Sequence, residues 1–140
     1  MNLIKSQMLE QIKVWLQAWN AHDLDGVMNL MHEGVVFENW TGVITIGKEP
    51  LRRSWLPWFL HHGNFKFIVE DIFVDELEQK ALFRWRLEWP SLEKAFKGKL
   101  EIRRGVDVLQ FLDGKIHQKY TYSKTTVMIE DRLVELTAAS

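Results

Sequence analysis

Residues 105–116 of the chain read GVDVLQFLDGKI, a strand pattern that runs directly into a tight turn. Side chains alternate between the two faces of a strand, so Asp107 shares a face with Leu109. Asp113-Gly114 is a strong hairpin signal because both residues tolerate the positive φ that a two-residue turn requires. The stretch therefore predicts a long strand over residues 100–111, a turn, and a second strand over residues 115–125.

The long strand carries its apolar residues in two phases. Leu100 and Ile102 are even-numbered, whereas Leu109 and Phe111 are odd-numbered. One extra residue in the strand would bring both sets to the same face, and glycine suits such a position. We therefore predict a β-bulge near Arg104-Gly105.

The period of two also covers the middle of the chain. Residues 65–69 read FKFIV, and residues 81–89 read ALFRWRLEW, so both segments predict strands. Arg86 and Glu88 share a face of the second segment; they could clamp a ligand but fit a solvated surface better. The residues after 125 are expected to form a short helix or a loose tail.

Ahead of these strands the apolar period is helical. It predicts helices over residues 4–19, 24–31 and 48–62, with a short strand over residues 35–40. Asp23 is the expected N-cap of the second helix, and Pro57 is expected to kink or shorten the third. Helices followed by strands in hairpins predict an α+β fold with an antiparallel sheet, and the length favours one domain over residues 1–140.

The composition excludes several classes of function. The formal net charge of −1 provides no basic field for nucleic acid, and no apolar run approaches the roughly 18 residues of a membrane helix. Cysteine is absent and the N-terminal residues lack a signal-peptide pattern, so we expect a cytoplasmic protein. His22, His32 and His117 show no zinc-site spacing, so we expect neither a metal nor another cofactor.

Aromatic residues are unusually frequent, with seven tryptophans and eight phenylalanines in 140 residues. Large rings fill cores well, but they also line pockets for flat or apolar ligands. The candidates for such a lining are Trp15, Trp55, Phe59, Trp85 and Phe111. Taken singly, each of them is more typical of an ordinary core.

Five motifs occur in an order that resembles one known family. They are WNAHDLD (residues 19–25), VVFEN (residues 35–39), RWR (residues 84–86), GVDVLQF (residues 105–111) and DGKI (residues 113–116). Together they resemble the SnoaL-like branch of the nuclear transport factor two superfamily, over about residues 5 to 125. The resemblance implies a curved sheet that the N-terminal helices close into a cone-shaped barrel with an internal pocket. It does not imply one activity, because this fold hosts isomerases, dehydratases, cyclases, epoxide hydrolases and binding domains.

The resemblance also implies roles for single residues. Asp107 matches an acid on the cavity side of this strand, which acts in acid/base chemistry in the cyclases and donates a hydrogen bond to an enolate oxygen in the ketosteroid isomerases. Asn39 stands where those isomerases carry a proton-abstracting aspartate, and an amide cannot act as that base. Trp15 replaces their hydrogen-bonding tyrosine, and Thr121 lies near a cavity aspartate of limonene epoxide hydrolases.

Each polar candidate has a second, structural interpretation. Asp107 would either transfer a proton or simply be paired with an arginine or a backbone group. Asn39 and Thr121 could orient polar groups of a ligand, or Asn39 could merely end its strand. His62 could reach the cavity mouth, or place a favourable charge at a helix C-terminus.

The leading hypothesis is a pocket protein for a small apolar or aromatic organic ligand. If catalytic, it would be a cofactor-free acid/base enzyme of the cyclase, isomerase or dehydratase type, acting on an apolar carbonyl compound with Asp107 as the proton-transfer group. The alternative is a binding module without chemistry, or an interaction module. Val106 and Val108 would make the outer sheet face apolar, so we also expect a homodimer formed through the sheet.

Overall fold

The computed structural model describes residues 1–136. The helices are α1 (Lys5–Asn20), α2 (Leu24–Asn29) and α3 (Lys48–His61), with a single 3-10 turn, η1 (Lys94–Phe96). The strands are β1 (Met31–Glu38), β2 (Ile44–Ile46), β3 (Lys66–Asp75), β4 (Lys80–Pro90), β5 (Leu100–Leu112), β6 (Lys115–Ser123), β7 (Thr126–Ile129) and β8 (Arg132–Glu135).

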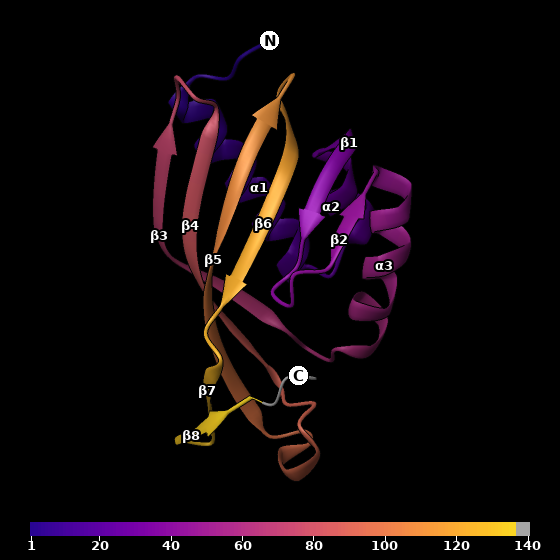
Figure 1. Ribbon diagram of the computed structural model, residues 1–140, viewed down its shortest axis with the longest axis vertical. Helices are drawn as coiled ribbons and strands as arrows, with labels where there is room; N and C mark the ends of the chain where they lie inside the picture. The colour runs from indigo at the N-terminus through magenta and orange to yellow at the C-terminus, as the bar shows by residue number, and fades with distance from the viewer. Residues whose placement is uncertain (137–140) are drawn as a thin grey trace.

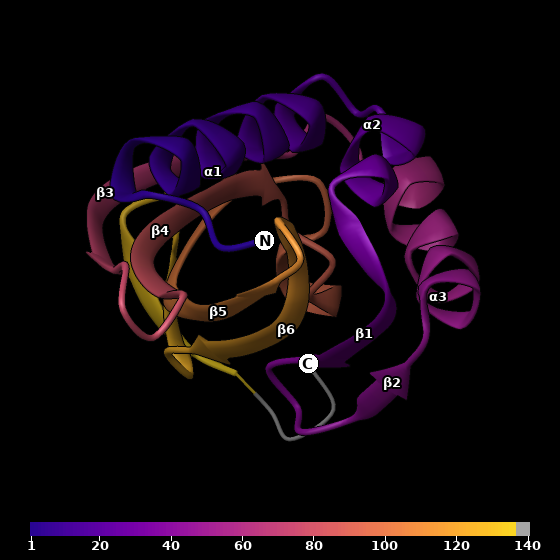
Figure 2. The same ribbon diagram turned by 90° about the horizontal axis from the view of Figure 1, so that it is seen from above.

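The strands form one curled sheet in the order β2-β1-β6-β5-β4-β3, and β7 joins β5 to β8. Figure 1 shows β3 to β6 side by side, and Figure 2 shows the sheet curling into a half-barrel that α1 covers on one side and α3 on another. The predicted α+β architecture is confirmed. The sheet is mixed, however, because β1 pairs with β6 in parallel. β1 follows a helix, so no hairpin constrains its direction.

The N-terminal helices form as their patterns predict. α1 buries Met8, Ile12, Trp15 and Trp19, which recur on one face. The Asp23 side chain accepts a hydrogen bond from a backbone N–H in the first turn of α2 and so caps that helix.

Helix α3, the first two strands and the residues after 125 differ from the prediction. α3 begins as predicted but continues through Pro57 as far as His61. Met31, expected on the second helix, begins β1 instead, and β2 was not predicted. The expectation of a helix or a loose tail after residue 125 is wrong, because β7 and β8 form a hairpin there; residues 137–140 lie outside the described part.

The predicted bulge at Arg104-Gly105 is wrong. β5 pairs with β4 without a break, so Leu100 and Ile102 lie on the outer face. The apolar phase changes because the inner face here holds the buried residues Glu101 and Arg103 in place of apolar ones.

Gly105 serves a close approach between neighbouring strands. A Cβ atom at this position would lie 2.2 Å from the carbonyl oxygen of Tyr122 and 2.4 Å from the Trp85 ring. Contacts that short do not occur in packed proteins, so a side chain here would push the Trp85 ring away. The glycine therefore lets this ring lie close against β5.

A bulge does occur, on β6 beside the hairpin. Asp113 and Gly114 both have positive φ, 51° and 76°, as the predicted turn requires. Phe111 then pairs with Ile116, but Gln110 pairs with Gln118, so His117 is an extra residue on β6. One extra residue reverses which side chains face inward along the rest of a strand.

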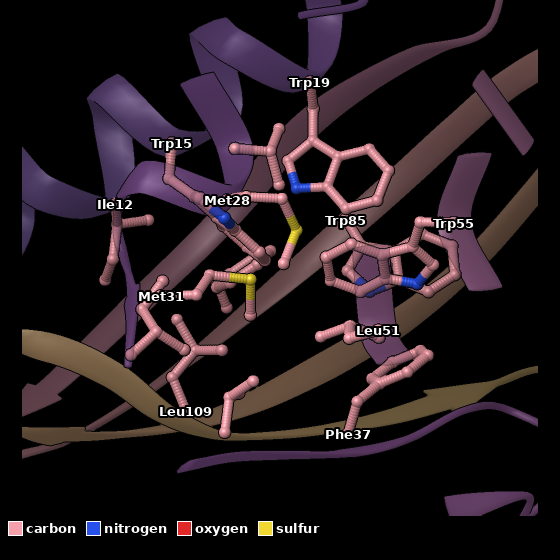
Figure 3. Packing of buried hydrophobic residues seen from close by; sticks show 14 of the residues in the cluster. Ile12, Trp15, Trp19, Met28, Met31, Phe37, Leu51, Trp55, Trp85 and Leu109 are labelled. Atoms are coloured by element: carbon pink, nitrogen blue, oxygen red, sulfur yellow. The ribbon is translucent and has the colours of Figure 1, made fainter. Parts of the chain in front are cut away.

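Figure 3 shows the core that fills the half-barrel. Trp15 and Trp19 project from α1 toward Trp55 of α3 and Phe37 of β1, and all four side chains are buried. The ring centroids of Trp19 and Trp55 are 4.8 Å apart in an edge-to-face arrangement. The same rings border a cavity on their other side.

Candidate functional site

A cavity of about 270 Å³ lies between α1, α3 and the inner face of the sheet. Its wall is mostly aromatic: Trp15, Trp19, Phe37, Trp40, Trp55, Trp58, Phe67, Phe83 and Trp85. The polar side chains on its wall are Asn39, Ser54, His62, Asp107, Lys119 and Thr121. The cavity is therefore an apolar space with polar groups at a few points, as is typical of small-molecule sites.

Asp107, Lys119 and Thr121 form a buried hydrogen-bonded cluster on the sheet side of the cavity. The carboxylate oxygen Oδ2 of Asp107 lies 3.1 Å from Lys119 Nζ. The other oxygen, Oδ1, accepts hydrogen bonds from Thr121 Oγ1 at 2.8 Å and from Trp85 Nε1 at 3.1 Å. Lys119 Nζ also donates to Thr121 Oγ1 at 2.6 Å, which closes a ring of contacts. Asp107 is 4% exposed and Lys119 is 7% exposed, so water screens this ion pair little.

The Lys119 ammonium is surrounded by rings. Nζ lies 4.7 Å from the ring centroid of Phe37, 5.8 Å from that of Trp15 and 5.9 Å from that of Trp55. Burial lowers the pKa of Lys119 below its usual value, and the attraction of the Asp107 carboxylate opposes this shift. The ring faces favour a cation, but they replace the water that would otherwise solvate it.

Sequence reasoning overlooked Lys119. The bulge at His117 decides its orientation: Ile116 faces inward before the extra residue, and Lys119 and Thr121 face inward after it. A usable signal was present, because residues two apart share a strand face. Placing Thr121 in the cavity therefore also places Lys119 there.

Most of the predicted site residues border the cavity together: Asp107, Asn39, Trp15, Trp55, His62, Trp85 and Thr121. Phe59 and Phe111 do not. Phe59 stacks on Trp19 with the ring centroids 4.9 Å apart, which turns it into the core. Phe111 lies four residues beyond Asp107 on β5, about 13 Å along the strand, and is buried near the hairpin end.

Asn39 and His62 both border the cavity, and each is held by contacts of its own. The Oδ1 of Asn39 accepts hydrogen bonds from Thr41 N, Thr41 Oγ1 and Val43 N, so it holds the loop after β1 and leaves the amide N–H groups for a ligand. The His62 ring stacks on Trp58 and Trp89, with centroids 4.1 Å and 5.4 Å apart. Burial lowers the pKa of His62, so the imidazole is mainly neutral at pH 7.

A second buried ion pair supports the aromatic residues beside the cavity. Arg103 Nη2 lies 3.2 Å from Glu101 Oε2, which also accepts a hydrogen bond from Trp89 Nε1 at 2.7 Å. The Arg103 guanidinium lies 4.4 Å from the centroid of the Trp40 ring. Because Trp40 borders the cavity, this ion pair holds part of its wall in place.

Residues 1–136 show neither a cluster of metal ligands nor a membrane-spanning helix. The described residues contain no group of three or more His, Asp or Glu side chains placed to hold a metal ion. None of the helices in this range is both long and apolar enough to cross a membrane.

Comparisons with known proteins agree with this architecture. A protein of unknown function from Mesorhizobium loti, described as NTF2-like, is 23% identical, with 89% of this chain and 96% of that chain covered and a TM-score of 0.69. A putative SnoaL-like polyketide cyclase from Jannaschia sp. CCS1 is 17% identical, covering 89% and 90%, with a TM-score of 0.74. TerC, co-crystallised with polyporic acid, is 15% identical, covering 85% and 92%, with a TM-score of 0.72. No curated protein sequence matches the chain.

These structural likenesses concern the fold, which also occurs in a putative ketosteroid isomerase from Kribbella flavida and in a protein described as having a cystatin-like fold. The family follows from the sequence itself. The model of the SnoaL-like domain matches residues 12–118, which run from the middle of α1 into β6 and include Asp107 on β5. The chain belongs to the SnoaL-like domain family.

Proposed function

We propose that the cavity binds a flat, apolar organic molecule whose carbonyl group points toward Asp107 and Lys119. The aromatic walls provide contact area for such a molecule, and the polar cluster lies on one side only. The observation that carries this proposal is the buried Asp107–Lys119 ion pair, because both residues line the cavity. TerC, a protein of this fold, was co-crystallised with polyporic acid, which supports a small organic ligand for this chain.

The pair could act as acid and base on the bound carbonyl compound. The Lys119 ammonium would donate a hydrogen bond or a proton to the carbonyl oxygen, while the Asp107 carboxylate would accept a proton from the neighbouring carbon. Trp85 and Thr121 donate to the same carboxylate oxygen, so they hold its plane and leave the other oxygen toward Lys119. Such proton transfers belong to cofactor-free cyclase, isomerase or dehydratase chemistry.

A binding module without chemistry is the second candidate. It is favoured by Asn39, which is an amide in the place where the ketosteroid isomerases carry their base. The Asn39 side-chain oxygen also accepts hydrogen bonds within its own loop. In this case the Asp107–Lys119 pair would only orient the ligand.

Deuterium exchange of a simple ketone separates the two candidates. The α protons of 2-tetralone in D2O would be followed by NMR, and its binding by quenching of tryptophan fluorescence. An enzyme accelerates the exchange, and Asp107→Asn retains binding but loses the acceleration. Binding of 2-tetralone without faster exchange in the wild-type protein would leave the binding module as the better description.

We also infer a homodimer formed through the outer face of the sheet. Val108 lies between Leu82 and Tyr120 across the strands, and Val106 pairs with Tyr122, which is 52% exposed. These side chains make a row of apolar surface that a second copy of the sheet would cover. Sedimentation equilibrium at high concentration tests the inference: a dimer that Val108→Glu dissociates supports it, and a monomer at every concentration removes it.

A further inference from the structure

Lys119 differs in its surroundings from every other lysine of residues 1–136. The others are exposed or half-buried, whereas Lys119 is buried and borders the cavity. Its Nζ is a primary amine, and a primary amine adds to the carbonyl carbon of an aldehyde or ketone when it is not protonated. The position of Nζ beside the cavity and its reactivity as an amine therefore both point to an aldehyde or ketone as the ligand.

We propose that Lys119 forms an imine with an aldehyde or ketone bound in the cavity. The proposal rests on the proposed function, since it requires a carbonyl compound in this place, and it adds a covalent step. It assigns to Lys119 the role of nucleophile and to Asp107 that of the group that carries protons for it.

The contacts of Nζ suit this role. One side of the amine faces Asp107 Oδ2 at 3.1 Å, and a second faces Thr121 Oγ1 at 2.6 Å. The remaining side faces rings at 4.7 to 5.9 Å, which cannot accept a proton and stabilise the charge less than water would. Burial thus favours the free amine, and Asp107 is the adjacent group that can take the proton.

The step balances with the groups present. Lys119 transfers a proton from Nζ to Asp107 Oδ2, and the neutral amine forms a bond to the carbonyl carbon. The carbonyl oxygen becomes a hydroxyl group after proton transfer from nitrogen, and the Asp107 carboxylic acid returns its proton to that hydroxyl as it leaves as water. The products are a protonated imine on Lys119, one water molecule and the Asp107 carboxylate, which can then remove a proton from the carbon next to the imine.

The test is reductive trapping with 2-naphthaldehyde and sodium cyanoborohydride at pH 7. Reduction converts an imine into a stable amine, and peptide mapping by mass spectrometry locates it. A lowered pKa provides more free amine at pH 7, so Lys119 should be labelled faster than the surface lysines. An excess of 2-methylnaphthalene, which has no carbonyl group, should slow this labelling by occupying the cavity.

Two variants act as a matched pair. Lys119→Arg retains a positive charge without a primary amine and should lose the adduct, whereas Lys124→Arg changes an exposed lysine just after β6 and should keep it. The peptide map of the wild-type protein gives the result even where the Lys119 variant fails to fold.

The outcomes separate the two proposals. An adduct on Lys119 that forms faster than those on the surface lysines supports the imine. Quenching of tryptophan fluorescence by 2-naphthaldehyde, with adducts only on surface lysines, overturns the imine and leaves noncovalent carbonyl binding in place. Quenching by neither naphthalene compound up to millimolar concentration overturns carbonyl binding in the cavity, and the imine with it.

Discussion

Asp107→Asn should destabilise the protein strongly, and the loss should depend on pH. The amide keeps the size of the carboxylate and can still accept from Thr121 and Trp85. It leaves the buried Lys119 ammonium without a counter-charge, since the described residues place no other carboxylate within ion-pair distance of Nζ. Removing one partner of a buried ion pair costs about 3 to 5 kcal/mol.

The charge on Lys119 sets an upper limit to this cost. The folded protein can always release the proton from Lys119. Releasing it costs about 1.4 kcal/mol for each unit by which the pH lies below the ordinary lysine pKa of 10.5, which amounts to about 5 kcal/mol at pH 7. A lysine whose pKa is lowered in the folded state destabilises the folded state, and the full penalty applies at pH values below this lowered pKa. The penalty disappears as pH rises toward the unfolded-state value, and at pH 9.5 the limit is only about 1.4 kcal/mol.

Urea unfolding of the wild type and Asp107→Asn at pH 7 and pH 9.5 measures both effects. We expect a loss of about 3 to 5 kcal/mol in unfolding free energy at pH 7 and a clearly smaller loss at pH 9.5. Lys119→Met combined with Asp107→Asn should recover part of the loss, because the unpaired charge is gone. A loss below about 1 kcal/mol at pH 7, or one that does not change with pH, would refute the buried-pair reasoning.

Three further changes test other parts of the structure. Gly105→Ala should cost about 1 to 3 kcal/mol because its Cβ has no space, whereas Gly34→Ala, whose Cβ would meet nothing closer than 3.5 Å, should cost clearly less; thermal unfolding compares the two. Deleting His117 removes the bulge but leaves Ile116, Gln118 and Lys119 in regular alternation opposite Phe111, Gln110 and Leu109, so Lys119 should still face inward and reductive trapping at this lysine should persist; loss of the adduct in a folded variant would contradict the register. Asp23→Ala removes the side-chain cap of α2 and should lower the unfolding free energy by about 1 kcal/mol, measured by urea titration.

Short stretches of sequence were sufficient to predict the buried face of α1, the hairpin turn and the direction of Asp107. The spacing of Ile12, Trp15 and Trp19 defines the buried face of α1, because a helix repeats every 3.6 residues. Asp113-Gly114 defines the hairpin, because few other pairs tolerate two positive φ values. The inward direction of Asp107 followed from the alternation of β5, and that inference holds because no bulge separates it from Leu109.

Non-local packing decided the other features, and here sequence reasoning failed. Leu100 and Ile102 suggested a bulge at Gly105, because an apolar inner face was assumed; the inner face instead holds Glu101 and Arg103 as a buried pair. Such a pair is stable only where aromatic neighbours and hydrogen-bond donors surround it, and those come from distant segments. Local alternation cannot reveal them.

The amino-acid sequence by itself determined the α+β class, the hairpin, the family and the acid at position 107. The tertiary structure decided which groups meet that acid. One extra residue, His117, sets the register of β6 and turns Lys119 toward Asp107. Helix packing in turn directs Phe59 into the core and Trp55 to the cavity. Register and ring orientation depend on the whole set of packed neighbours, which no short stretch of sequence contains.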